Sequence, residues 1–77
     1  MPADRGVPVP YLREWRLRVL LKQEELAEKA GISRPTILRG ERGETLSIDN
    51  IRKLAAALNI TVEQLRFERP EGAGGPR

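Results

Sequence analysis

The chain has 77 residues, which leaves room for one small domain, and its 39% hydrophobic and 32% charged content suits a soluble helical protein. It has no cysteine, which excludes disulfides and thiolate metal sites, and no histidine, the commonest acid–base group and metal ligand. We therefore expect no metal and no cofactor. Since the apolar runs are far too short to cross a bilayer and no signal peptide opens the chain, we expect a cytoplasmic protein without a membrane partner.

The formal net charge of +3 is weak evidence for a nucleic-acid partner, but the placement of the charges says more. Residues 33–43 contain three arginines and one acid, whereas residues 24–29 (EELAEK) contain three glutamates and one lysine. The sign of the charge therefore changes at Gly31. From charge alone, a solvated helix face explains this pattern as well as DNA binding does.

Both ends of the chain lack helical periodicity. Residues 1–9 (MPADRGVPV) hold two prolines and a glycine and predict a flexible N-terminal arm. Residues 70–77 (PEGAGGPR) form a Gly/Pro tail that cannot make a packed element, so we predict a disordered tail there. The folded domain should then occupy residues 10–69.

Between these ends the apolar residues recur with helical spacing, and no segment alternates with the period of a strand. The first helix is expected to begin at Pro10, which a first turn tolerates, and to continue through YLREWRLRVLLK. Its apolar stripe is expected to comprise Leu12, Trp15, Val19 and Leu20. The second helix is expected over residues 23–30, with two glutamates near the positive end of its dipole.

Three more helices follow, each with a recognisable start. Ser33 is a good N-cap for a third helix over residues 34–41, and Ser47 can cap a fourth, IDNIRKLAAAL, whose apolar residues form one stripe. Thr61 opens a short fifth helix, and Gln64 three residues later completes a capping box. The sequence therefore predicts an all-α fold of five short helices.

The spacing of three residues predicts a tight corner between the second and third helices. Ala27 offers the small side chain that a close helix crossing needs, and Gly31 tolerates the positive φ of the turn. Ile37 can bury one face of the third helix. Residues 34, 35, 38 and 39 then share the outward face, and a helix presented in this way fits the major groove of DNA.

These residues resemble the helix-turn-helix of the XRE family, the phage Cro and repressor type. Members of that family read Q-x-x-L-A, then G-[VI]-S, then a helix rich in arginine or glutamine, then E-x-G. The matching residues here are Gln23, Leu26, Ala27, Gly31, Ile32, Ser33, Glu41 and Gly43. Residues 51–65 resemble the family's LxKLAxALGVSxxxL segment, so the likeness spans about residues 12–65. It implies a compact lambda-repressor-like fold and sequence-specific binding of double-stranded DNA by a small transcriptional regulator, a repressor.

The resemblance also implies roles for individual residues. Gln23 would hydrogen-bond a DNA phosphate and brace the recognition helix, and Thr36 would lie near the DNA backbone. Arg16 and Glu41 would form an ion pair that ties the first helix to the third. Five residues would face the bases: Ser33, Arg34, Pro35, Leu38 and Arg39.

The chemistry of the base-facing side chains suggests what each would contact. An arginine at position 34 or 39 favours guanine, which offers O6 and N7 to its fork of donors. Pro35 is a candidate for a thymine methyl, although stiffening the first helical turn is an equally good role for it. Leu38 is a second candidate methyl reader, or it covers the core.

The loop after the third helix offers candidate phosphate contacts. Arg42, Thr45 and Ser47, with the amides that open the fourth helix, can hold an anion as helix N-termini do. An ordinary loop followed by a helix cap explains these residues equally well.

The chain departs from the family pattern at four places. Leu20 replaces a frequent glycine and Lys22 a Ser/Thr cap, so the first corner lacks its usual signals. Gly40 replaces a bulky apolar residue and leaves core volume, which Trp15 is a candidate to fill. The loop GETLS lacks the frequent proline and is one residue short.

Two other classes of function compete with DNA binding. An enzyme is a poor alternative, since the sequence shows no Gly-rich phosphate loop and no paired carboxylates in a plausible cleft. An antitoxin or an adaptor that binds another protein is the better rival, because the same fold can serve those roles.

We expect a homodimer on a palindromic operator, because one small domain buries too little DNA surface for high specificity. The resemblance places the dimer interface around residues 58–67. Leu65 and Phe67 are the apolar candidates there, although one of them can instead close the core.

Overall fold

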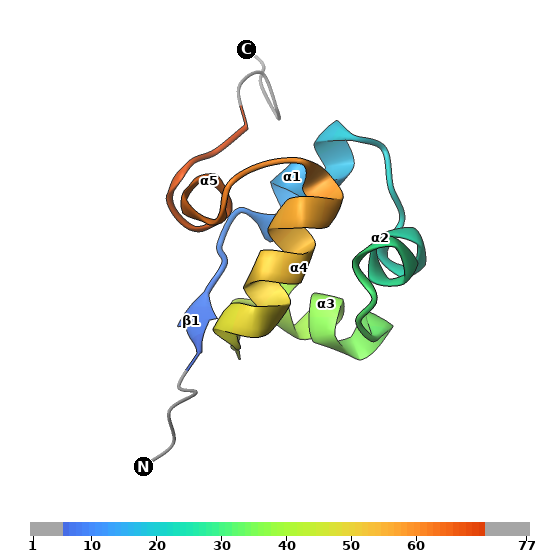
Figure 1. Cartoon of the computed structure of the whole chain (residues 1–77), viewed down its shortest axis with the longest axis horizontal. Coiled ribbons are helices and arrows are strands. Elements are labelled where there is room, and N and C mark those ends of the chain that lie inside the picture. Colours follow the sequence, from blue (N-terminus) through green and yellow to red (C-terminus); the bar gives the residue numbers. More distant parts are fainter. Residues whose placement is uncertain (1–5, 71–77) are drawn as a thin grey trace.

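The computed structural model describes residues 6–70, in which five helices and a two-stranded sheet surround one core (Figure 1). The elements in chain order are β1 (Val7–Pro8), α1 (Leu12–Arg18), α2 (Gln23–Ala30), α3 (Arg34–Glu41), β2 (Thr45–Leu46), α4 (Ile48–Leu58) and α5 (Val62–Phe67). Helix α2 packs against α3 and α4, and α5 packs against α4 and α1. The predicted fold of five short helices is confirmed, and the short sheet is an addition to it.

The starts of the last three helices follow from their caps. Ser33 and Ser47 each accept a hydrogen bond from the backbone N–H three residues later, at 3.4 and 3.1 Å. Thr61 and Gln64 each accept the other's backbone N–H at 3.0 Å, which is the predicted capping box. These local signals satisfy backbone donors that a helix start otherwise leaves without partners.

Helix α1 is shorter than predicted. It begins at Leu12 and ends at Arg18, and Leu20 adopts a left-handed conformation with φ of 60°. As a result Leu20 is 87% exposed and Val19 is 44% exposed, so the predicted apolar stripe holds only for Leu12 and Trp15. A helix cannot continue through a residue at positive φ, which is why the sequence pattern overestimated its length.

The N-terminal arm predicted for residues 1–9 is wrong in its last part. Val7 pairs with Leu46 and Pro8 with Thr45 in the antiparallel sheet, and Val9 is fully buried. Tertiary pairing holds this segment, so its prolines do not leave it outside the fold. Residues 1–5 of the predicted arm and residues 71–77 of the predicted tail lie outside the described part of the chain.

Gly40 is the reason that this segment can dock against α3. A Cβ atom added there would stand 2.9 Å from Cδ1 of Leu46 and 3.0 Å from Cδ2 of Leu12, with Val9 next to them. These side chains fill the volume that the missing side chain leaves. The expectation that Trp15 fills it is wrong, because the indole N–H of Trp15 donates instead to the carbonyl of Glu68 at 2.9 Å.

The core takes apolar side chains from all five helices and from the sheet. Those with no exposed surface are Val9, Leu12, Leu26, Ile37, Ile51, Leu54 and Leu65. In α5 it is Leu65 that closes the core, whereas Phe67 is 62% exposed. Within residues 6–70, no helix has the length and apolar character that crossing a bilayer requires.

Candidate nucleic-acid interface

The corner between α2 and α3 has the geometry that its sequence predicts. Gly31 adopts φ of 75° and ψ of 31°, the left-handed conformation expected of a glycine just after a helix. The N–H of Gly31 donates to the carbonyl of Glu28 at 3.3 Å, and that of Ile32 to the carbonyl of Ala27 at 3.0 Å. These two bonds form a Schellman motif, which fixes the direction in which the chain leaves α2.

Side-chain packing then holds α3 against the rest of the domain. Ala27 is 6% exposed and Ile37 is fully buried, as the spacing of these residues predicts. A Cβ at Gly31 would meet no atom within 4 Å, so the glycine is required by its backbone conformation rather than by space.

The outer face of α3 carries the residues that the sequence assigned to the bases. All five are exposed, whereas the inward residues of the same helix are buried, in the order expected for 3.6 residues per turn. The exposed residues are Ser33, Arg34, Pro35, Leu38 and Arg39. Leu38 is 39% exposed, so the alternative in which it covers the core is not what the structure shows.

Thr36 does not share this face. It is 7% exposed, and its hydroxyl lies 2.8 Å from the hydroxyl of Ser33. The pair stabilises the first turn of α3 from the inside. A side chain so buried is poorly placed to reach a phosphate, and we therefore leave Thr36 out of the proposed DNA contacts.

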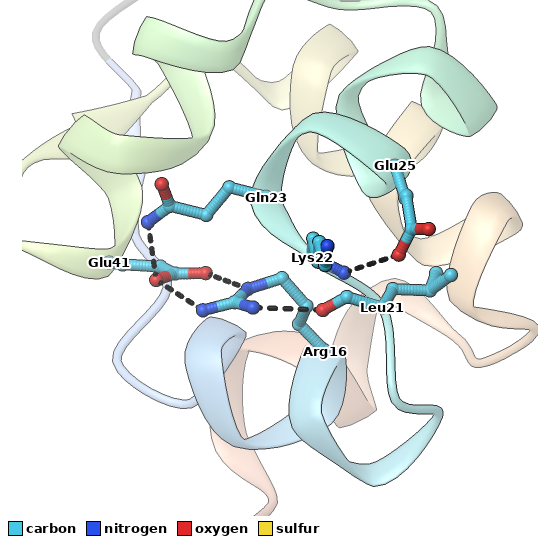
Figure 2. A network of polar contacts seen from close by, with 6 residues as sticks. All are labelled: Arg16, Leu21, Lys22, Gln23, Glu25 and Glu41. Atoms are coloured by element: carbon cyan, nitrogen blue, oxygen red, sulfur yellow. Dashed lines mark hydrogen bonds and ion pairs between the residues drawn. The ribbon is translucent and has the colours of Figure 1, made fainter.

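A buried network of polar groups braces α3 from the opposite end (Figure 2). The guanidinium of Arg16 in α1 donates to both carboxylate oxygens of Glu41 in α3, at 2.5 and 3.0 Å. The side chains of this pair are only 10% and 6% exposed. The geometry is the bidentate fork that gives the strongest arginine–carboxylate contacts.

Gln23 joins the same network from α2. Its side-chain Nε2 donates to Oε1 of Glu41 at 3.1 Å, so three helices meet at one carboxylate (Figure 2). The bracing role predicted for Gln23 thus has a direct structural basis. Its predicted contact with a DNA phosphate remains a prediction.

The first corner, between α1 and α2, is stabilised without its usual sequence signals. Arg16 donates to the carbonyl of Leu21 at 2.8 Å, and the carboxylate of Glu25 accepts the backbone N–H of Lys22 at 2.8 Å (Figure 2). Lysine has no acceptor to return that bond, so only half of a capping box forms. The sequence analysis missed these contacts, although an acid three residues after the cap position was the visible signal for the second.

The loop after α3 extends the exposed face of that helix and forms the edge of the candidate DNA-binding surface. Arg42 and Thr45 are exposed, whereas Ser47 is half-buried and serves as the N-cap of α4. Glu44 lies between the side chains of Arg39 and Arg42, at 4.0 and 3.8 Å. The sequence analysis missed this acid.

The sequence matches the family model described as Helix-turn-helix over residues 12–65. No curated protein matches it. Among solved structures, the restriction-modification controller protein C.AhdI from Aeromonas hydrophila is 43% identical with a TM-score of 0.68, over 71% of this chain and 85% of that one.

Structures of SinR, the master regulator of biofilm formation in Bacillus subtilis, are also similar. SinR in complex with DNA is 30% identical with a TM-score of 0.66, over 70% of this chain and 89% of that one. The complex of SinR with the protein SinI gives 28% identity and a TM-score of 0.72, over 80% of this chain and 62% of that one.

Proposed function

The chain belongs to the XRE-type helix-turn-helix family, and from that premise we propose that it regulates transcription by binding double-stranded DNA with sequence specificity, with α3 as its recognition helix. One observation carries the proposal. The outward face of α3 is exposed and carries arginines, while the inward face is locked by Ile37 and the Arg16–Glu41 pair. A rigid helix with a cationic outer face is the element that reads a major groove.

We assign direct base contacts to the side chains on that face. Arg34 and Arg39 offer forks of donors to O6 and N7 of guanine, each pair adding about 1–3 kcal/mol of discrimination. Pro35 and Leu38 present apolar surface suited to a thymine methyl. Ser33 lies at the start of the helix, where recognition helices approach the base edges.

Phosphate contacts would then position the helix in the groove. We assign these to Arg42 and Thr45, which are exposed in the loop after α3, and to Gln23 at the start of α2. Ser47 caps α4, and its contribution would come through the amides at that helix start.

We also propose that the protein acts as a homodimer on a palindromic operator, as a cytoplasmic repressor. Phe67 supports a dimer through α5, because a side chain of that size at 62% exposure is available for burial against a second copy. The half-sites would lie about 34 Å apart, which is one turn of DNA.

A role in protein binding is the second candidate. SinR, which is similar to this chain, forms a complex with the protein SinI. An adaptor or antitoxin would bind random duplexes weakly, with no preferred sequence.

Selection of bound duplexes from a random pool tests the proposal. We expect a two-fold symmetric consensus containing guanine in each half-site. The affinity for that duplex should fall with salt, with a slope of roughly −5 to −9 in log K against log salt if a dimer neutralises about 6–10 phosphates. Recovery of no consensus, with weak binding to every duplex, would contradict it and favour the adaptor.

A further inference from the structure

Glu44 is the only acidic side chain among residues 6–70 that pairs with the arginines of the recognition surface. Its Oε1 lies 4.0 Å from Nε of Arg39, and its Oε2 lies 3.8 Å from Nη2 of Arg42. All three side chains are between 48% and 62% exposed, so the contacts are made in solvent. One carboxylate is therefore shared by two of the cations proposed to contact DNA.

The backbone fixes Glu44 in that position. Gly43 adopts φ of 95°, its N–H donates to the carbonyl of Gly40 at 3.2 Å, and the N–H of Glu44 donates to the carbonyl of Arg39 at 3.0 Å. This is a Schellman motif at the end of α3, and it places Glu44 beside the last turn of the helix. On its other side the chain enters β2, where Leu46 is buried and paired with Val7.

An acid at this position is unfavourable for the helix itself. The C-terminal end of a helix carries partial negative charge, and a carboxylate there is repelled by it. Surface ion pairs with arginines return only about 0–1 kcal/mol each. Stability therefore gives no strong reason for a glutamate at position 44.

We infer that Glu44 lowers the affinity of the recognition surface for DNA, because its carboxylate competes with the DNA for Arg39 and Arg42. The inference rests on the proposed recognition surface. On a random duplex the two arginines find only phosphates, and each such contact must first displace the carboxylate. On the operator, Arg39 gains the two directed bonds of a guanine, and it must leave the same carboxylate to make them.

The test is the variant Glu44→Gln, which keeps the shape of the side chain and the backbone cap but removes the charge. Binding to a random duplex should tighten about two- to fivefold, the range that corresponds to a surface ion pair of up to about 1 kcal/mol. For this variant, the slope of log K against log salt should become more negative by about 0.9, because one more cation becomes available to neutralise a phosphate. Binding to the selected operator should tighten by at least as much, because there too each arginine must leave the carboxylate before it contacts the DNA.

The matched control is Glu28→Gln, which makes the same change of net charge at an exposed position of α2, outside the proposed DNA contacts and the proposed dimer interface. We expect this variant to tighten binding to either duplex less than Glu44→Gln does. An equal effect of the two variants would mean that only net charge matters and would overturn the inference. So would unchanged binding of Glu44→Gln to both duplexes.

A double-mutant cycle separates this inference from the function on which it rests. If Arg39→Ala and Arg42→Ala both weaken DNA binding, the recognition surface stands, and Glu44→Gln should then have a smaller effect in either background than alone. Additive effects would overturn the role of Glu44 only. No effect of the two arginine variants would instead contradict the recognition surface itself.

Discussion

The backbone N–H of Ile32 donates to the carbonyl of Ala27 at 3.0 Å, and this bond sets the direction in which the chain passes from α2 to α3. It forms only because Gly31, between the two, adopts a φ of 75°. The placement of every proposed DNA contact on α3 depends on that turn.

Gly31→Val should therefore destabilise the domain by about 1–3 kcal/mol, because a β-branched residue is strained in the left-handed region. Thermal unfolding followed by circular dichroism measures the loss. Gly31→Asn is the matched control, since asparagine tolerates this conformation better and should cost less. An unchanged melting temperature for the valine variant would show that the corner does not need this conformation.

Arg16→Ala should cost about 3–5 kcal/mol, because it leaves the buried carboxylate of Glu41 without its partner. That is a large part of the roughly 5–15 kcal/mol typical of a small domain, and urea titration would measure it. Arg13→Ala, which removes an exposed arginine from the same helix, should stay within about 0.5 kcal/mol. Equal costs for the two variants would contradict a bracing role for the pair.

Leu20→Gly should stabilise the protein, by about 0.5–1 kcal/mol. Relief of the left-handed backbone at φ of 60° should exceed the entropy that glycine adds to the unfolded chain. Leu20→Ala removes the same exposed apolar surface but keeps a Cβ, so it should give no such gain. Equal gains from both variants would assign the effect to the exposed leucine side chain instead.

Arg39→Ala should weaken binding to the selected operator about 5- to 150-fold, equivalent to the 1–3 kcal/mol of a bidentate base contact. The melting temperature should not fall, since this side chain is 49% exposed and its ion pair is with the equally exposed Glu44. Arg69→Ala makes the same change of charge beyond α5 and should reduce affinity far less. Fluorescence anisotropy with a labelled duplex measures the affinity of each variant. Unchanged affinity and specificity of Arg39→Ala would remove Arg39 from the recognition surface.

Much of the fold could be predicted from the sequence because its signals are local. Ser33, Ser47 and Thr61 cap their helices through residues three positions away, and Gly31 ends α2 through its own backbone freedom. Such features lie within a few residues of chain and need no knowledge of the rest of the molecule.

The parts that were missed depend on segments far apart in sequence. Pairing of Val7 with Leu46 gives the segment before α1 a place in the fold, and the volume at Gly40 is shared among side chains from three segments. The positive φ of Leu20 was also missed, since leucine rarely adopts it, although the glycine frequent at this position in the family was the available signal.

In the candidate site, the exposed face of α3 could be predicted from helical periodicity alone. The position of Glu44 could not. Thr36 lies on the inward face of α3 with Ile37 and Gly40, as the same period predicts, whereas Glu44 reaches Arg39 through the turn at Gly43. Side-chain contacts of this kind follow from the folded backbone rather than from spacing.

The most direct test of the account is an NMR titration of the ¹⁵N-labelled protein with the selected operator duplex. The account predicts that the largest amide shifts occur at residues 33–39, apart from Pro35, and at residues 42–45, while a random duplex shifts the loop more than the helix. Amide signals of α3 that stay in place while operator binding perturbs another surface would contradict it.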